Sequence, residues 1–188
     1  MRLQGKRVLV TGAGAGLGKA IALAFAREGA TVAVNDIDAT TGEAVAEEIK
    51  NLGGGRCFVK ANVANESEVR TMIGNVVEEF GGLDIMVNNA GIEMVKPFVE
   101  VTENEWDKLM SVNVKGVFNG CKHAIPELEK SGGGAVINMA SAAGLLGWPL
   151  LSVYCATKGA VILLTKSLAQ EYKGTNLRFN ALCPMVID

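Results

Sequence analysis

The sequence predicts an α/β fold in which helices cover both faces of one parallel sheet, giving three layers, α/β/α. Six short runs of apolar and β-branched residues alternate with five longer runs in which apolar residues recur at helical spacing. The short runs are nearly continuous in apolar residues, as strands buried on both faces of a parallel sheet should be. No linker or repeat interrupts the alternation, so residues 1–188 are expected to form a single domain.

The expected elements follow in chain order. Strands are predicted at Arg7–Val10, Thr31–Asn35, Arg56–Ala61, Ile85–Asn88, Ala135–Met139 and Leu177–Leu182. Helices are predicted at Leu17–Glu28, Thr41–Leu52, Glu66–Phe80, Glu103–Glu129 and Tyr154–Lys173. Ile21, Ala24 and Phe25 are expected to face inward from the first helix. Glycine runs at 53–55 and 132–134 are interpreted as turns, because glycine accepts the left-handed conformation that follows a helix.

Composition excludes several classes of function. The net charge is −2, so no basic face is expected to bind nucleic acid or an anionic membrane. No apolar run approaches the roughly 20 residues that span a bilayer, and no signal-peptide core precedes the first strand, which favours a cytoplasmic location. The cysteines (Cys57, Cys121, Cys155 and Cys183) lie far apart and are interpreted as reduced thiols. His123, the only histidine, has no ligand at metal-binding spacing, so no metal site is expected.

A glycine turn joins the first strand to the first helix. Gly12, Gly16 and Gly18 lie in the run Val-Leu-Val-Thr-Gly-Ala-Gly-Ala-Gly-Leu-Gly. Glycines there permit a tight turn and let the backbone approach a pyrophosphate, which the N–H groups and dipole of the helix N-terminus attract. The position of the motif between strand and helix predicts a dinucleotide site.

The second strand ends at Asn35-Asp36. A carboxylate at this place can accept hydrogen bonds from both adenosine ribose hydroxyls, and it would repel the 2′-phosphate of NADP. No Arg or Lys lies in the glycine turn or directly after Asp36 to offset that repulsion. NAD is therefore the expected cofactor, and NADP is disfavoured. The alternative is that Asp36 only caps a turn.

A reactive group of side chains follows the fifth strand. Ser141 lies at the strand's carboxyl end, where ligands of parallel sheets bind, and Tyr154 comes thirteen residues later. Lys158 is at i+4 from Tyr154, so the two side chains share one helix face.

Together these motifs resemble the short-chain dehydrogenase/reductase family, whose members have a Rossmann fold. The resemblance spans the whole chain and consists of the turn Thr11–Gly18, the run Asn88–Gly91, Asn113, Ser141 and the pair Tyr154 and Lys158. It implies an NAD-dependent oxidoreductase acting on a secondary alcohol or ketone. Asn88–Gly91 is also interpreted as a hydrogen-bonded turn that holds the sheet together.

The resemblance also implies a role for each catalytic residue. Tyr154 would be the general acid/base, and Lys158 would lower its pKa and hold the nicotinamide ribose. Ser141 would hydrogen-bond the substrate oxygen, and Asn113 would complete a proton path through a water near Lys158.

Further residues are implied to contact the cofactor. The full set is Gly12, Ala15, Gly16, Leu17, Gly18, Asp36, Ile37, Asn62, Val63, Asn89, Ala90, Gly91, Tyr154, Lys158, Pro184 and Val186. Asn62 and Val63 should meet the adenine. Family members usually have Asp where Asn62 stands, but the Asn carbonyl can still bond the adenine amino group. Met185 replaces the glycine that usually follows Pro184.

Apolar segments of the sequence indicate the kind of substrate and the mode of subunit assembly. The loop at 145–151, with Trp148 at its centre, predicts a hydrophobic substrate, unless it packs under a lid or in a subunit interface. The helices that carry Asn113 and Tyr154 have apolar residues on several sides (Val117, Phe118, Val161, Leu164 and Leu168). In the family such helices pair as a four-helix bundle, which implies a homodimer and, with a second interface, a homotetramer.

Family members continue for several dozen residues with a lid, a helix and a seventh strand, which these 188 residues lack. Either the 188 residues are part of a longer polypeptide, which we favour because every catalytic position is filled, or the protein is natively short. The second case favours a non-catalytic NAD-binding protein, such as a sensor or a truncated partner subunit. An epimerase or dehydratase would need a further acid or base in the lid.

Overall fold

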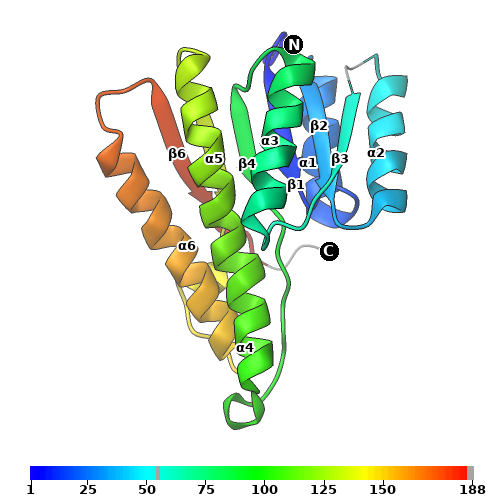
Figure 1. Cartoon of the computed structure of the whole chain (residues 1–188). Coiled ribbons are helices and arrows are strands. Elements are labelled where there is room, and N and C mark those ends of the chain that lie inside the picture. The colour runs from blue at the N-terminus through cyan, green and yellow to red at the C-terminus, as the bar shows by residue number, and fades with distance from the viewer. Residues whose placement is uncertain (54–55, 186–188) are drawn as a thin grey trace.

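A computed structural model describes residues 1–53 and 56–185, and its centre is one parallel sheet (Figure 1). The strands are β1 (Arg7–Thr11), β2 (Thr31–Asp36), β3 (Arg56–Lys60), β4 (Ile85–Asn88), β5 (Gly134–Met139) and β6 (Leu177–Leu182). They lie in the order β3-β2-β1-β4-β5-β6, and each neighbouring pair is parallel. All six strands were predicted to within one residue at each end. The predicted doubly wound α/β sheet is confirmed.

The helices are α1 (Gly16–Arg27), α2 (Ala39–Asn51), α3 (Glu66–Phe80), α4 (Glu103–Met110), α5 (Gly116–Lys130) and α6 (Ser152–Glu171). Side chains cap three of them. Asp38 accepts from the backbone of the first turn of α2, Asn65 does so for α3, and Thr102 forms a capping box with Glu105 at α4. Gly81 ends α3 in the left-handed conformation.

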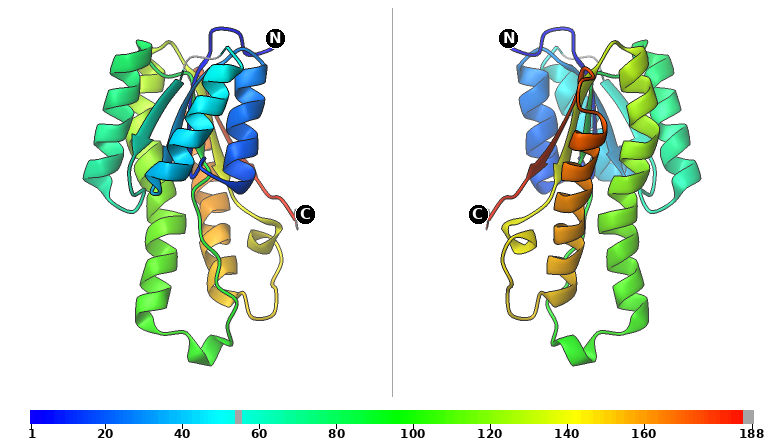
Figure 2. Two further views of the ribbon diagram at one scale, coloured as in Figure 1. Left: turned by 90° about the vertical axis from the view of Figure 1, so that its right-hand side faces the viewer. Right: turned by 90° about the vertical axis from the view of Figure 1, so that its left-hand side faces the viewer.

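Alternate residues of the central strands face opposite helical layers. Val8 and Val10 of β1 pack with α1 and α2, whereas Leu9 packs on the other face with α3, α5 and α6. Figure 2 shows α1 and α2 on one side of the sheet and α3 and α5 on the other. Burial on both faces explains why the strand sequences are almost continuously apolar.

Two helix predictions need correction. Ile21, Ala24 and Phe25 were expected to face inward from α1. Ile21 and Phe25 are partly buried and pack against the core, but Ala24 is exposed, and the fully buried residues are Gly18, Ala22, Leu23 and Ala26. Alanines occupy several sides of α1, so its apolar pattern does not define a single inward direction. The helix predicted at Glu103–Glu129 contains a π-helical turn, η2 (Ser111–Lys115), between α4 and α5. Changing a few hydrogen bonds from i→i−4 to i→i−5 leaves little trace in apolar spacing.

The turns after the helices behave as the glycines predict. Gly53 has φ +80°, and Gly132 and Gly133 have φ +88° and +124°, conformations that favour glycine. Gly54 and Gly55, in the first of these runs, lie outside the described residues. Within the described ranges, no helix is both long and apolar enough to cross a membrane. The same residues form no group of His, Cys, Asp and Glu suited to a metal ion.

Candidate active site

The glycine turn lies where the strand order reverses, between β1 and its neighbours β2 and β4. In doubly wound sheets this switch point opens a crevice at the carboxyl ends of the strands. Gly12 and Gly16 have φ +60° and +50°, conformations that favour glycine. A Cβ on Gly18 would lie 2.1 Å from the Gly12 carbonyl oxygen, so α1 approaches the turn more closely than any side chain permits.

Asp36 is bonded to the glycine turn. Its Oδ2 accepts from the Gly14 N–H at 2.8 Å, and its Oδ1 accepts from the Asp38 N–H at 3.0 Å. A Cβ on Gly14 would lie 2.8 Å from Asp36 Oδ2, so Gly14 is needed as well. Sequence reasoning missed Gly14, although its place in the Gly-rich run was a usable signal. Asp36 thus caps a turn and keeps lone pairs for a ligand, so the two interpretations of this residue are compatible.

Polar side chains join the ends of β1 and β4. Thr11 Oγ1 accepts from the N–H groups of Asn89 and Ala90, at 3.0 and 3.1 Å. Asn89 Nδ2 donates to the carbonyl oxygens of Thr11 and Gly12. Asn88 points into the core instead and donates to Asn138 Oδ1. The run from Asn88 therefore does hold the sheet together, as its structural interpretation required.

A cavity of about 680 Å³ follows the glycine turn and crosses the ends of β1, β2, β3 and β4. Its volume is in the range of small-molecule sites. The predicted cofactor residues that line it are Gly12, Ala15, Gly16, Leu17, Gly18, Asp36, Ile37, Asn62, Val63, Asn89, Ala90 and Gly91. The structure thus brings together twelve residues from four loops that are far apart in the sequence.

A second cavity, of about 440 Å³, adjoins the first and is lined by three of the four candidate catalytic residues, the exception being Asn113. Both cavities are lined by Leu17, Asn89, Gly91 and Ile92, so they form one cleft. The second is also lined by Ser141, Tyr154, Lys158 and Pro184. Pro184 is held there because its carbonyl oxygen accepts from the Ala142 N–H, beside Ser141. Val186 lies outside the described residues.

The three side chains of the reactive group converge from two elements. Ser141 follows β5 and caps the short helix η3 (Ala142–Gly144), and its Oγ accepts from the Ala143 N–H. Tyr154 comes from α6 and lines the second cavity together with Ser141, which acts to lower the pKa of the Tyr154 phenol. Lys158, one turn further along α6, is buried, and its Nζ lies 5.6 Å from the centroid of the Tyr154 ring.

Electrostatics at this group differ from what the family resemblance implied. Lys158 was expected to lower the pKa of Tyr154. Instead, burial raises the pKa of the Tyr154 phenol, with Glu93 and Cys155 adding to the rise and Ser141 opposing it. Burial also lowers the pKa of Lys158, to about 8. The Lys158 ammonium donates to the Met139 carbonyl oxygen at 2.8 Å, which fixes its position beside the Tyr154 ring.

Asn113 lies in the π-helical turn η2 and is buried. Its Oδ1 accepts from the Ile92 N–H, and its Nδ2 donates to the Ile92 carbonyl and to Thr157 Oγ1, all at 2.8 to 3.1 Å. Asn113 therefore fastens the segment after β4 to α6. Its place in a proton path stays a prediction.

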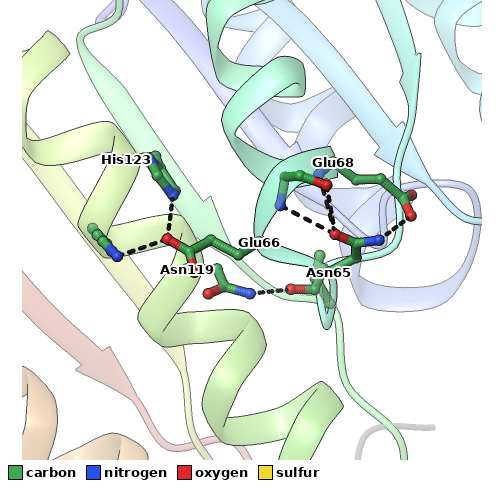
Figure 3. Close-up of polar contacts among 8 residues, drawn as sticks. Asn65, Glu66, Glu68, Asn119 and His123 are labelled. Atoms are coloured by element: carbon green, nitrogen blue, oxygen red, sulfur yellow. Dashed lines mark hydrogen bonds and ion pairs between the residues drawn. The ribbon is translucent and has the colours of Figure 1, made fainter.

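Residues of α3 and α5 hold the loop at 62–64, which lines the first cavity. Glu68 Oε2 accepts from the Asn62 N–H, and Asn119 Nδ2 donates to the Val63 carbonyl oxygen, each at 2.8 Å. Figure 3 shows Glu66, at the start of α3, pointing toward His123 of α5, while Asn65 and Glu68 are bonded to each other. Glu66 Oε1 lies 3.4 Å from His123 Nε2 and accepts from Lys122. Sequence reasoning missed Glu68 and Asn119. Asn119 is 56 residues from Val63 along the chain, and Glu68, six residues from Asn62, contacts only a backbone N–H of the loop.

Comparisons with known proteins agree with this geometry. A family model described as short chain dehydrogenase matches residues 6–188. An "Uncharacterized oxidoreductase" of Thermotoga maritima is 46% identical over 184 residues, which are 98% of this chain and 72% of that protein. The 3-oxoacyl-[acyl-carrier-protein] reductase FabG of Staphylococcus aureus is 45% identical, over 95% of this chain and 73% of the reductase.

One solved structure has a similar fold along the full length of this chain. It is a short chain dehydrogenase/reductase from Burkholderia phymatum in complex with NAD. The TM-score is 0.95 at 30% sequence identity, and the match covers 100% of this chain and 68% of the other.

Proposed function

Because this chain belongs to the short-chain dehydrogenase family of oxidoreductases, we propose that it transfers a hydride between NAD(H) and a secondary alcohol or ketone. The observation that carries the proposal is the single cleft. One half has the glycine turn and Asp36, and the other half has Ser141, Tyr154 and Lys158.

The residues of the first cavity fit a dinucleotide. The N-terminus of α1 and the N–H groups of the glycine turn would hold the pyrophosphate, where the open space at Gly16 leaves room for it. Asp36 would accept from the adenosine ribose, and its charge favours NAD over NADP. The NAD complex of the Burkholderia relative supports the same choice. When bound, the nicotinamide supplies the hydride acceptor or donor.

The residues of the second cavity handle the substrate oxygen and its proton. Tyr154 would take the hydroxyl proton during oxidation and return it during reduction. Ser141 would donate to the same oxygen and stabilise charge that develops on it. Lys158, held by Met139, would keep a positive charge beside the Tyr154 ring and bond the nicotinamide ribose.

The substrate is proposed to be apolar over much of its length. Leu145, Leu146 and Trp148 are exposed in the loop between Ser141 and Tyr154. The segment after β4 runs beside this loop, since the Lys96 N–H donates to the Leu150 carbonyl. The Staphylococcus reductase is named for an oxoacyl substrate, which supports a ketone on an acyl chain as a second candidate.

The direct test is an assay of NAD reduction with a panel of secondary alcohols, in which the absorbance of the reduced nicotinamide is monitored. The reverse reaction is followed with NADH and the matching ketones, including an oxoacyl thioester. Turnover with any of these supports the dehydrogenase. Binding of NAD by calorimetry with no turnover on the whole panel would favour the non-catalytic NAD-binding protein instead.

We expect Asn119→Ala to weaken NAD binding by roughly tenfold, because it removes a buried hydrogen bond that holds the adenine loop. The matched control is Asp84→Asn. Asp84 pairs with Arg7 at the opposite end of the sheet and lines neither cavity of the cleft. The dissociation constants of NAD and of ADP-ribose are measured by calorimetry. An equal loss of NAD affinity in both variants would mean that Asn119 only stabilises the fold and does not position the adenine loop.

We also propose a homodimer that pairs the α5 and α6 helices. Val117 and Val161 are buried within the chain's own core, so they are not available for pairing. Phe118 of α5 and Leu163 of α6 are 45% and 68% exposed and would form the contact. Light scattering is expected to give a dimer for the wild type and a monomer for Leu163→Glu. A monomeric wild type at micromolar concentration would contradict the pairing. A homotetramer stays a prediction.

A further inference from the structure

Glu93 brings a carboxylate to the wall of the reaction cavity. It follows β4 by five residues and lines the second cavity together with Ser141, Tyr154 and Lys158. The other lining residues are mostly apolar or glycine, among them Ile92, Met139 and Met185. The charge of Glu93 reaches the phenol, since it contributes to the raised pKa of Tyr154. No role for Glu93 follows from the motifs of the sequence.

The backbone around Glu93 is anchored on both sides. The buried Asn113 amide bonds both the N–H and the carbonyl of Ile92, the residue directly before Glu93. Three residues after Glu93, the Lys96 N–H donates to the Leu150 carbonyl oxygen at 2.8 Å. The segment is therefore fastened to η2 on one side and to the loop before α6 on the other. These anchors keep Glu93 at the cavity rather than on a free loop.

The nearby cations are already engaged. Lys96 Nζ lies 2.9 Å from both carboxylate oxygens of Glu105, and Lys158 Nζ donates to the Met139 carbonyl. Among residues 1–53 and 56–185, no hydrogen bond or ion pair ends on the Glu93 side chain. Its carboxylate therefore keeps all of its acceptor capacity for a ligand.

We propose that Glu93 determines substrate specificity by accepting a hydrogen bond from a hydroxyl or ammonium group next to the reacting carbon. This inference rests on the proposed dehydrogenase function and narrows its substrate class. A carboxylate only accepts hydrogen bonds, and charge-assisted bonds of this kind are among the strong ones. The same charge repels a carboxylate or phosphate at that place on the substrate. The substrate is thus apolar along the Trp148 loop and carries a donor beside its reacting carbon.

The test uses four secondary alcohols of one chain length that differ beside the reacting carbon. They carry a methyl, a hydroxyl, an ammonium or a carboxylate group, and kcat/KM is measured for each with NAD. The wild type should favour the diol or the amino alcohol over the methyl compound and disfavour the hydroxy acid. Comparing the diol with the amino alcohol shows whether Glu93 prefers a hydroxyl or an ammonium group as the hydrogen-bond donor.

Glu93→Gln should reduce the preference for the donor-bearing substrate by roughly ten- to a hundredfold, because it removes the charge at nearly constant shape. Glu100→Gln is the matched control. Glu93 and Glu100 are both exposed on the same connection, but Glu100 does not line the cavity, so its variant should keep the wild-type preference. An unchanged preference in Glu93→Gln, or a wild type that favours the hydroxy acid, overturns the proposal.

Calorimetry separates this proposal from the proposed function. Each of the four alcohols is titrated into NAD-saturated wild type and Glu93→Gln. Selective binding of the diol or amino alcohol that is lost in Glu93→Gln supports the role of Glu93, even where turnover is absent and the dehydrogenase proposal fails. Binding without any selectivity between the four compounds overturns the role of Glu93 and leaves the dehydrogenase proposal standing.

Discussion

Replacing Tyr154 by Phe is expected to lower kcat for alcohol oxidation by a factor of about 10² to 10⁴, the usual contribution of a positioned general acid/base. The change removes only the phenolic hydroxyl. The half-buried ring remains beside Lys158, whose bond to the Met139 carbonyl is untouched. The dissociation constant of NAD should therefore change little. Steady-state kinetics and calorimetry on the same preparation measure both quantities.

A matched control for Tyr154→Phe is Tyr172→Phe. Tyr172 follows the other end of α6 and packs on Phe179, away from both cavities of the cleft. It should keep wild-type kcat. Residual activity in Tyr154→Phe within threefold of the wild type would assign the proton transfer to another group and remove the main support for the mechanism.

The raised pKa of Tyr154 gives the reaction a direction-dependent pH profile. Oxidation needs the phenolate as proton acceptor, and a pKa above the ordinary value of about 10 leaves little phenolate at neutral pH. The oxidation rate should rise with pH across the neutral and mildly alkaline range. Reduction needs the protonated phenol, so its rate should stay level up to about pH 8, where Lys158 begins to lose its positive charge.

The second large effect is expected at Asp36. Asp36→Asn removes the negative charge at the end of β2 and should lower the ratio of kcat/KM for NAD over NADP by roughly ten- to a hundredfold, since like-charge contacts cost several kcal/mol. The Asn carbonyl can still accept from one of the two N–H groups, Gly14 or Asp38, that the carboxylate holds. The glycine turn should thus stay close to its present form.

Asp38→Asn is the control for charge alone. Asp38 is two residues further on, caps α2 and does not line the cofactor cavity. Its variant should leave the ratio near the wild-type value while the Asn side chain continues to cap the helix. A ratio that falls equally in both variants would show that the general charge of this region, and not the position of Asp36, selects the cofactor.

Local pattern was sufficient for the strands and for most of the site. The six strands are buried on both faces, so each appears as a continuous apolar run with clear ends. The glycine turn and the pair Tyr154 and Lys158 are local motifs, and their spacing places them at one edge of the sheet. The inward face of α1 was predicted only in part, because small apolar residues occur around most of that helix: Ile21 and Phe25 pack against the core, but Ala24 is exposed.

Residues that act across the fold escaped sequence reasoning. Glu68 of α3 and Asn119 of α5 each bond a backbone group of the 62–64 loop. Every residue has such backbone groups, so the sequence of the loop does not indicate these contacts. Asn113 was identified through the family resemblance, but its bonds to Ile92 and Thr157 depend on how the π-helical turn faces α6. The electrostatics of Tyr154 depend on burial and on Glu93, and both are set by packing.

The sequence by itself determined the order of the strands along the chain, the glycine turn, the acidic end of β2 and the choice of the candidate catalytic side chains. These features are encoded by neighbours in the chain, through periodicity and the conformational freedom of glycine. Only the tertiary structure decided that twelve residues from four loops line one cavity, that Lys158 is bound to Met139 and that Glu93 lines the second cavity. Such contacts join distant segments, and their energies depend on burial and distance, which a linear pattern does not contain.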